Sequence, residues 1–287
     1  MSSRRDFVRL ASTGLAGFVG LPAFRLESLA AGRPAGALGP AAIQPVGVQL
    51  YTLRSLMAED VAGTLRAVAE IGYREVEFAG LFDTPPADVR TLLDELGLDA
   101  VSSHVSMDRI REQPAAVLDE AEALGLRYVT CPSIGRDELT PEGLPGLADD
   151  FNRFGEMSRH RGLGFAYHNH DFEFEEVAGF VPYDRLLEQC DADLVKMQLD
   201  VYWVTHAGRD PVAYLRAHPG RFPMIHVKDR TPAGEMVDVG DGTIDFSEIL
   251  KAAEVAGLEH WLVEHDGPED PLASIRRSYA TVSALGG

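Results

Sequence analysis

Hydrophobic and polar positions follow two alternating periods from Val46 onward. Short apolar runs rich in Val, Ile, Phe and Tyr, typical of buried strands, alternate with amphipathic runs that have the 3.6-residue period of helices. The pattern predicts strands at residues 46–51, 73–78, 98–104, 127–131, 163–168, 194–200, 222–227 and 260–265. It predicts helices at residues 60–71, 86–96, 114–124, 143–161, 183–190, 210–217, 247–256 and 271–284.

Eight strand–helix units within 287 residues predict one α/β domain, a (β/α)8 TIM barrel over residues 45–285. A doubly wound parallel sheet is the alternative, although that fold usually has fewer units. In a barrel, the carboxyl ends of all the strands meet at one face, and active sites are built there. Residues at the predicted strand ends are therefore the candidates for function.

The first thirty residues have the order of a signal peptide, with a charged start, an apolar middle and small residues at the end. Arg4 and Arg5, followed by Phe7 and Val8, resemble a bacterial twin-arginine export signal. We therefore expect a twin-arginine-type signal peptide at 1–30, a flexible linker at 31–44, and the twin-arginine export machinery as a partner. The mature protein would be periplasmic or extracellular. A basic, frayed N-terminus of a cytosolic protein is the alternative.

The formal net charge of −19 argues against nucleic acid or an anionic membrane as the main partner. Phosphate binding requires clustered Lys and Arg, whereas the charge places little restriction on a small carbohydrate. The two cysteines, Cys131 and Cys190, are far apart in the chain and have no metal-binding spacing. We expect two separate buried thiols, with Cys131 in the core.

Four predicted strands in the second half of the chain lead into side chains that can bind a metal. They are His168, Asp200, His226 and Glu264, spaced by 32, 26 and 38 residues, about one strand–helix unit each. If the strands close into a barrel, these side chains converge. A mixed nitrogen and oxygen set suits Mn²⁺, Co²⁺, Zn²⁺ or Fe²⁺ better than Mg²⁺ or Ca²⁺.

Other strand ends and nearby loops carry polar or aromatic side chains toward the same face. We expect a group of them to contact a substrate, although a purely structural role is the alternative for each: Gln49, Tyr51, Glu77, His104, Glu173 and Trp203. Phe174 is a further candidate for packing against a sugar face. Lys228, two residues after His226, is a candidate for steadying an oxyanion, and a solvated rim lysine is its alternative.

Five segments of the chain resemble signatures of the sugar phosphate isomerase/epimerase family, whose members are xylose isomerase-like barrels. The resemblance covers about residues 44–284 and is carried by Gly47-Val48-Gln49-Leu50-Tyr51, Tyr167-His168-Asn169-His170-Asp171, Leu199-Asp200-Val201-Tyr202-Trp203, His226-Val227-Lys228-Asp229 and Val263-Glu264-His265-Asp266. It implies a barrel with a divalent metal and a carbohydrate substrate, and such barrels often pair as homodimers.

Within this family, the epimerases hold their metal with Glu, Asp, His and Glu from strands five to eight. Asp200, His226 and Glu264 match the last three positions, but the chain has His168 where epimerases have Glu. The fourth ligand is therefore open between His168, His170 and Glu173. The histidine-containing pattern is similar to the inosose dehydratase branch.

The leading hypothesis is a metal-dependent isomerase or epimerase that removes a proton beside the carbonyl of a sugar or keto-sugar and forms an enediolate. Candidate bases are Glu264, His168 and His170. The first alternative is a lyase or dehydratase acting on a keto-sugar, keto-glycoside or keto-cyclitol. The second is a non-catalytic periplasmic sugar-binding barrel. The acidic charge argues against a nuclease.

Overall fold

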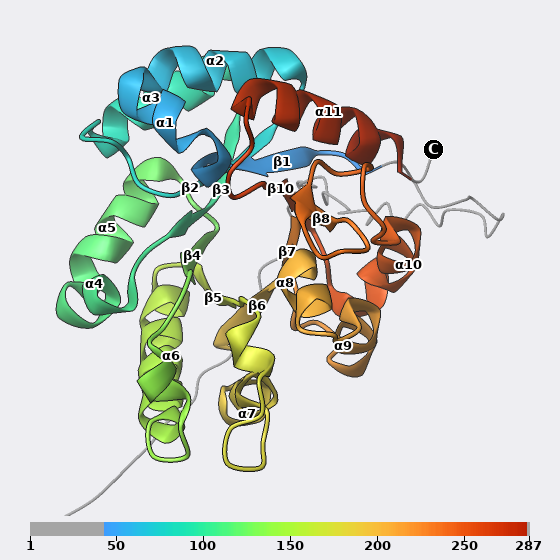
Figure 1. Cartoon of the computed structure of the whole chain (residues 1–287). Coiled ribbons are helices and arrows are strands. Elements are labelled where there is room, and N and C mark those ends of the chain that lie inside the picture. Colours follow the sequence, from blue (N-terminus) through green and yellow to red (C-terminus); the bar gives the residue numbers. More distant parts are fainter. Residues whose placement is uncertain (1–42, 286–287) are drawn as a thin grey trace, which may run out of the picture. The chain divides into compact units, whose positions relative to one another are not determined.

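Eight parallel strands close into a barrel in the computed structural model, which describes residues 43–285 (Figure 1). The order around the barrel is β1-β10-β7-β6-β5-β4-β3-β2, so each strand lies beside its neighbour in the chain and β1 closes the ring against β10. The strands are β1 Val46–Gln49, β2 Glu75–Phe78, β3 Asp99–His104, β4 Tyr128–Cys131, β5 Gly164–His168, β6 Val195–Asp200, β7 Met224–Val227 and β10 His260–Val263. The predicted TIM barrel is confirmed.

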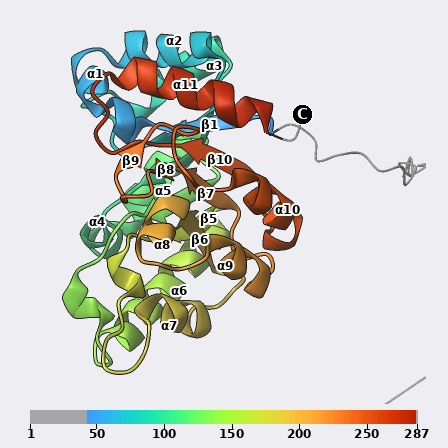
Figure 2. The same cartoon turned by 45° about the vertical axis from the view of Figure 1, so that its right-hand side comes forward.

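Helices surround the strands, as the two views in Figures 1 and 2 show. They are α1 Arg54–Glu59, α2 Val61–Ile71, α3 Pro86–Leu96, α4 Met107–Glu112, α5 Pro114–Leu124, α6 Leu144–His160, α7 Pro182–Gln189, α8 Val201–His206, α9 Pro211–Ala217, α10 Phe246–Ala256 and α11 Pro271–Ala284. Their apolar faces pack on the strands. On α6, for example, Phe151 and Phe154 lie with ring centroids 5.3 and 5.2 Å from that of Phe165 on β5.

Several boundaries differ from the predictions where a side chain ends a strand early. The strand predicted at 46–51 stops at Gln49, because the side-chain oxygen of Gln49 accepts the N–H of Tyr51 and starts a 3₁₀ turn at Leu50–Leu53. Asp200 similarly caps α8, which follows β6 directly. The pattern also missed α1, α4 and a short hairpin, β8 Asp229–Arg230 with β9 Met236–Val237.

The proposed signal peptide at 1–30 and residues 31–42 of the proposed linker lie outside the described residues. Within the described part, Ile43 is buried and its N–H donates to the carbonyl of Leu285, 3.2 Å away. Cys131 and Cys190 are buried free thiols. Among the helices in residues 43–285, none has both the length and the apolar character needed to cross a bilayer.

Candidate active site

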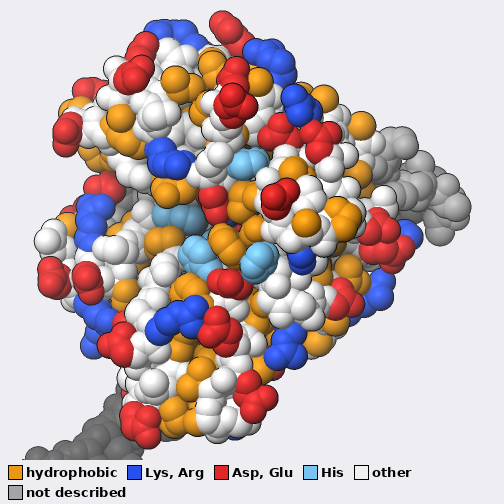
Figure 3. Space-filling model, in the orientation of Figure 1, with side chains coloured by type: hydrophobic (Ala, Val, Ile, Leu, Met, Phe, Trp, Pro, Cys, Tyr) orange, Lys and Arg blue, Asp and Glu red, His pale blue; other side chains and the backbone are white. Residues whose placement is uncertain are grey.

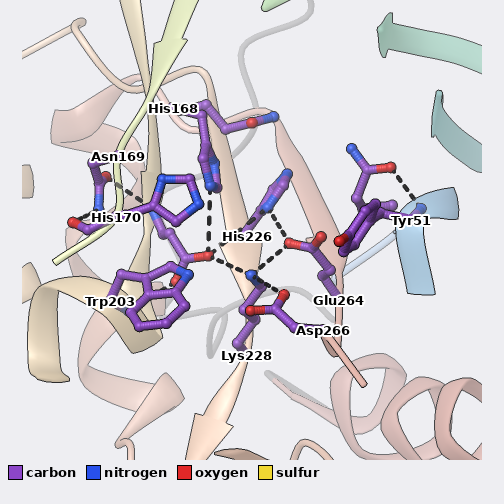
Figure 4. Close-up of polar contacts among 12 residues, drawn as sticks. Tyr51, His168, Asn169, His170, Trp203, His226, Lys228, Glu264 and Asp266 are labelled. Carbon is purple, nitrogen blue, oxygen red and sulfur yellow. Dashed lines mark hydrogen bonds and ion pairs between the residues drawn. The ribbon is translucent and has the colours of Figure 1, made fainter. Parts of the chain in front are cut away.

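Asp200, His226 and Glu264 converge at the carboxyl ends of β6, β7 and β10. Figure 4 shows His226 and Glu264 side by side, next to Lys228. All three are buried, and one ligand atom from each lies within 4.8 Å of the others. Nδ1 of His226 is 2.6 Å from Oε2 of Glu264 and 3.9 Å from Oδ2 of Asp200. Among the described residues none of these three atoms has a contact with hydrogen-bond geometry, although both carboxylate oxygens form ion pairs with Lys228. Two buried carboxylate oxygens and an imidazole nitrogen that face one point are a donor set that fits a divalent cation.

Lys228 supplies the positive charge that these carboxylates need. Its Nζ lies 3.0 Å from Oδ2 of Asp200, 2.8 Å from Oε2 of Glu264 and 2.7 Å from Oδ1 of Asp266. Burial opposes the charged form of Lys228, but the three carboxylates raise its pKa above the ordinary value. Burial also disfavours ionised Glu264, yet Lys228 and His226 hold its pKa well below the ordinary value. Burial raises the pKa of Asp200 to about 6.

His168 ends β5 and lies beside this group. Its Nε2 is 4.0 Å from Oδ2 of Asp200, and its Nδ1 is buried without a hydrogen-bond partner among the described residues. Burial, with the neighbouring imidazoles and Lys228, lowers the pKa of His168 well below its ordinary value, so its ring is neutral at pH 7. His168, His226 and His104 also form a second group whose ligand atoms lie within 4.8 Å of one another.

His170 follows on the loop after β5, and its ring is held between aromatic side chains. The ring centroids of Phe172 and Trp203 each lie 5.6 Å from that of His170. Burial and the charge of Lys228 lower the pKa of His170 to about 4. Its Nδ1 is buried and has no hydrogen-bond partner in the described part of the chain. The structure therefore presents a neutral imidazole with a free nitrogen.

Glu173 is turned away from the group of ligand atoms. One oxygen of its fully buried carboxylate accepts the hydroxyl of Tyr167, and the other accepts the N–H of His170 at 2.9 Å. It positions the loop that carries His170. Asn169 belongs to one of the family-like segments but had no predicted role. It links the same loop to β6, because its Oδ1 accepts the N–H of Asp200 at 3.1 Å.

Glu77 and Gln49 lie deeper in the barrel and bind protein groups. Nε2 of Gln49 donates to Glu77 at 2.8 Å, and Nε2 of Gln198 donates to its other oxygen at 2.7 Å. Glu77 also lies 2.6 Å from Nε2 of His226. Burial disfavours ionised Glu77, but His104 and His226 lower its pKa to about 2. Gln198, which bonds His104 as well, was missed, although it faces inward two residues before Asp200.

A cavity of about 280 Å³ opens beside these groups, large enough for a monosaccharide or a cyclitol. Its lining contains Tyr51, His104, Pro132, Ser133, His168, His170, Lys228, Glu264 and Asp266. Histidine side chains gather around the middle of the face that Figure 3 shows. Trp203 stands next to the cavity, with its ring centroid 5.8 Å from Nζ of Lys228.

Phe174 is the sequence-based candidate that the structure removes from this region. It is buried, and its ring packs against Tyr183 and Tyr214 at centroid distances of 4.7 and 5.5 Å. The expectation that it contacts a sugar face was wrong, because the 3₁₀ turn at Phe172–Phe174 directs it into the core. Pro132, Ser133 and Asp266 also line the cavity. Pro132 and Ser133 carried no signal in the sequence beyond their places after a strand, whereas Asp266 belongs to one of the five family-like segments but was not assigned a role.

The sequence and the fold of this chain are similar to those of known barrel proteins. A family model described as a xylose isomerase-like TIM barrel matches residues 65–281. An inosose dehydratase from Geobacillus kaustophilus is 25% identical over 260 residues, which cover 76% of this chain and 83% of that protein. Other curated inosose dehydratases match over about half of their length.

Solved structures are similar over most of the chain. A sugar phosphate isomerase/epimerase from Parabacteroides distasonis has a TM-score of 0.75 and 26% identity, covering 88% of this chain and 96% of that one. The IolI protein with a zinc atom has a TM-score of 0.67 and 16% identity, covering 84% of this chain and 98% of that one. At that identity the second likeness shows the fold alone.

Proposed function

The chain belongs to the xylose isomerase-like TIM barrel family, and from this premise we propose that it is a divalent-metal-dependent dehydratase of a keto-cyclitol or keto-sugar. The observation that carries the proposal is the convergence of buried ligand atoms of Asp200, His226 and Glu264 beside a cavity of sugar size. The inosose dehydratase that is similar over 83% of its length favours elimination of water as the outcome.

Asp200, His226 and Glu264 would hold the cation, with His168 as the fourth ligand because its Nε2 lies 4.0 Å from Oδ2 of Asp200. When bound, a divalent cation there supplies Lewis acidity toward the substrate carbonyl and an adjacent hydroxyl. The carboxylates remain ionised without it because Lys228 lies within 3.0 Å of both. Mn²⁺, Co²⁺, Zn²⁺ or Fe²⁺ suits this mixture of imidazole and carboxylate better than Mg²⁺.

His170 is the proposed base. Its neutral ring lines the cavity, its Nδ1 has no partner among the described residues, and stacking on Phe172 fixes its plane. The imidazole takes the proton from the carbon next to the carbonyl, which leaves an enolate. The imidazolium then returns that proton to the hydroxyl on the next carbon, whose C–O bond breaks, and water leaves as the C=C bond forms.

An isomerase or epimerase is the second candidate, favoured by the Parabacteroides protein named sugar phosphate isomerase/epimerase at 26% identity. It shares the first proton transfer with the dehydratase and differs in the second. The proton returns to carbon, on another face or at the neighbouring position, and no group leaves. The mass of the product therefore distinguishes the two functions.

Metal content and product mass test the proposal together. We expect the wild type to hold one divalent ion per chain, Asp200→Ala to lose it, and the metal-loaded wild type to convert a 2-keto-cyclitol to a product lighter by one water. His170→Gln should keep the metal and lower kcat by about 10²- to 10⁴-fold. His160→Gln, on the exposed end of α6, is the matched control and should match the wild type.

Two results would contradict the proposal in different ways. A product of unchanged formula from keto-sugars would make the enzyme an isomerase. A well-folded wild type that holds no metal, and takes up none from Mn²⁺, Co²⁺ or Zn²⁺, would favour the non-catalytic sugar-binding barrel.

A further inference from the structure

We propose that Glu77 determines which nitrogen of His226 binds the cation: by accepting the proton on Nε2, it commits Nδ1 to the point shared with Asp200 and Glu264. This inference rests on the metal site of the proposed function and assigns Glu77 a positioning role. It replaces the expectation from the sequence that Glu77 contacts the substrate.

The two sides of the His226 ring are not equivalent. Nε2 forms a hydrogen bond to Oε2 of Glu77 at 2.6 Å, and both side chains are completely buried. Nδ1 lies equally close to Oε2 of Glu264, at 2.6 Å, but this contact does not have hydrogen-bond geometry. A histidine that binds a metal through one nitrogen usually donates the other N–H to a carboxylate or carbonyl. His226 has that arrangement.

The surrounding amides show that Glu77 is the acceptor. Oε1 of Gln49 accepts the backbone N–H of Tyr51 at 2.9 Å, which can only donate. The amide of Gln49 is therefore fixed, and its Nε2 must face Glu77, which accepts this N–H at 2.8 Å. Gln198 presents its Nε2 to the other carboxylate oxygen at 2.7 Å, while its Oε1 lies 3.0 Å from Nε2 of His104.

Both oxygens of Glu77 thus accept amide N–H groups, and the carboxylate is placed to accept a further N–H from the nitrogen of His226 that contacts it. A protonated Nε2 is excluded as a ligand. This decides how His226 can act, since it belongs to two candidate groups, one with Asp200 and Glu264 and one with His104 and His168. A site formed with His104 and His168 through Nε2 of His226 is therefore ruled out. Nδ1 of His226 remains available to bind a cation together with Asp200 and Glu264.

The same strand offers a matched control at the opposite end of the barrel. Glu75, two residues before Glu77, is buried and lies with both carboxylate oxygens 3.0 Å from Nδ1 of His260, which is buried too. Neither Glu75 nor His260 belongs to a group of converging ligand atoms in the described part of the chain. Glu75→Gln therefore perturbs a buried carboxylate–imidazole pair without touching the proposed metal site.

The test is the Zn²⁺ dissociation constant, measured by competition with a chromophoric chelator, for the wild type, Glu77→Gln and Glu75→Gln. We expect Glu77→Gln to weaken Zn²⁺ binding by about 10- to 100-fold. Glu75→Gln should lower the unfolding temperature but leave Zn²⁺ binding within about twofold of the wild type. Equal binding by Glu77→Gln and the wild type would overturn the inference while leaving the metal site intact. A wild type that binds no Zn²⁺, Mn²⁺ or Co²⁺ would overturn both.

A second measurement is made on the wild type, and it uses a variant only to assign the signals of His226. Long-range ¹H–¹⁵N spectra of the histidine rings, recorded on the Zn²⁺-loaded wild type, report which nitrogen carries a proton. We expect His226, assigned by its loss in His226→Gln, to have a protonated Nε2 and a metal-shifted Nδ1. The reverse pattern would contradict the role of Glu77, even if a Glu77 variant failed to fold.

Discussion

At the scale of single residues, Glu173 is a buried carboxylate that lies near the active site but points away from it. The sequence left it as a candidate ligand because it lies on the loop after the fifth strand, from which it could reach back to the metal site. Its direction depends on two donors that the pattern could not identify, the Tyr167 hydroxyl and the His170 N–H. Burial is the largest influence and raises its pKa to about 7.

Glu173 should make stability fall as pH rises. Between pH 4.5 and 7 the unfolded chain releases this proton while the folded chain keeps it, so unfolding becomes easier as pH rises and the effect is complete above pH 7. The loss attributable to Glu173 is about 3 kcal/mol. Glu173→Gln is neutral at every pH and should lack that part of the slope. Urea unfolding at pH 5 and pH 8 measures the difference.

Glu176→Gln, an exposed position three residues further on, is the control and should keep the wild-type slope. If Glu173→Gln and the wild type lost equal stability between pH 5 and pH 8, Glu173 would be ionised throughout. The two hydrogen bonds it accepts would then outweigh its burial.

At the scale of elements, the period of the sequence located the eight strands and the eight main helices but not the turns that begin with a side chain. Tyr51 was predicted in a strand and lies in a 3₁₀ turn, because Gln49 caps that turn through its side-chain oxygen. α8 was missed for a similar reason: the carboxylate of Asp200 accepts the N–H of Trp203 at its start. Such caps depend on one rotamer, which hydrophobic periodicity does not encode.

The long loop after β7 is organised by one buried carboxylate. Asp229 accepts four backbone N–H groups, from Arg230 at 2.8 Å, Gly240 at 3.0 Å, and Gly242 and Ile244 at 3.1 Å each. The loop packs so closely that a Cβ on Gly242 would lie 2.2 Å from Oδ1 of Asp229. Asp229 therefore anchors the loop. It follows Lys228 of the active site directly in the chain.

Removing this carboxylate should loosen the loop and destabilise the barrel. We expect Asp229→Ala to lower the free energy of unfolding by about 2–4 kcal/mol, because four backbone N–H groups lose a buried, charged acceptor. Hydrogen exchange should accelerate at Gly240, Gly242 and Ile244. Asp241→Ala, an exposed position on the same loop, should change stability by less than about 0.5 kcal/mol. Unchanged exchange at these three amides in Asp229→Ala would show that the loop has another anchor.

At the scale of the whole molecule, the number of strand–helix units predicted a barrel, but the closure itself could not be derived from the pattern. Closure requires β1 to pair with β10, as Val48 does with Val263, more than two hundred residues away in the chain. A contact between early and late segments of the chain supports it, since Tyr73, just before β2, donates its hydroxyl to the carbonyl of Ile275 on α11 at 2.8 Å. Hydrophobic periodicity gives the elements, whereas pairing across the ring depends on tertiary packing.

Export of the folded barrel also concerns the whole molecule. Both cysteines are buried free thiols, so the fold requires no disulfide and is compatible with folding in a reducing compartment before export. We propose that Arg4 and Arg5 direct the folded, metal-loaded protein to the twin-arginine machinery, a signal read by a receptor. Replacing both arginines with lysine should abolish export, whereas Arg25→Lys in the same segment should not. Immunoblots of periplasmic and cytoplasmic fractions measure this, and equal periplasmic amounts of both variants would refute the twin-arginine route.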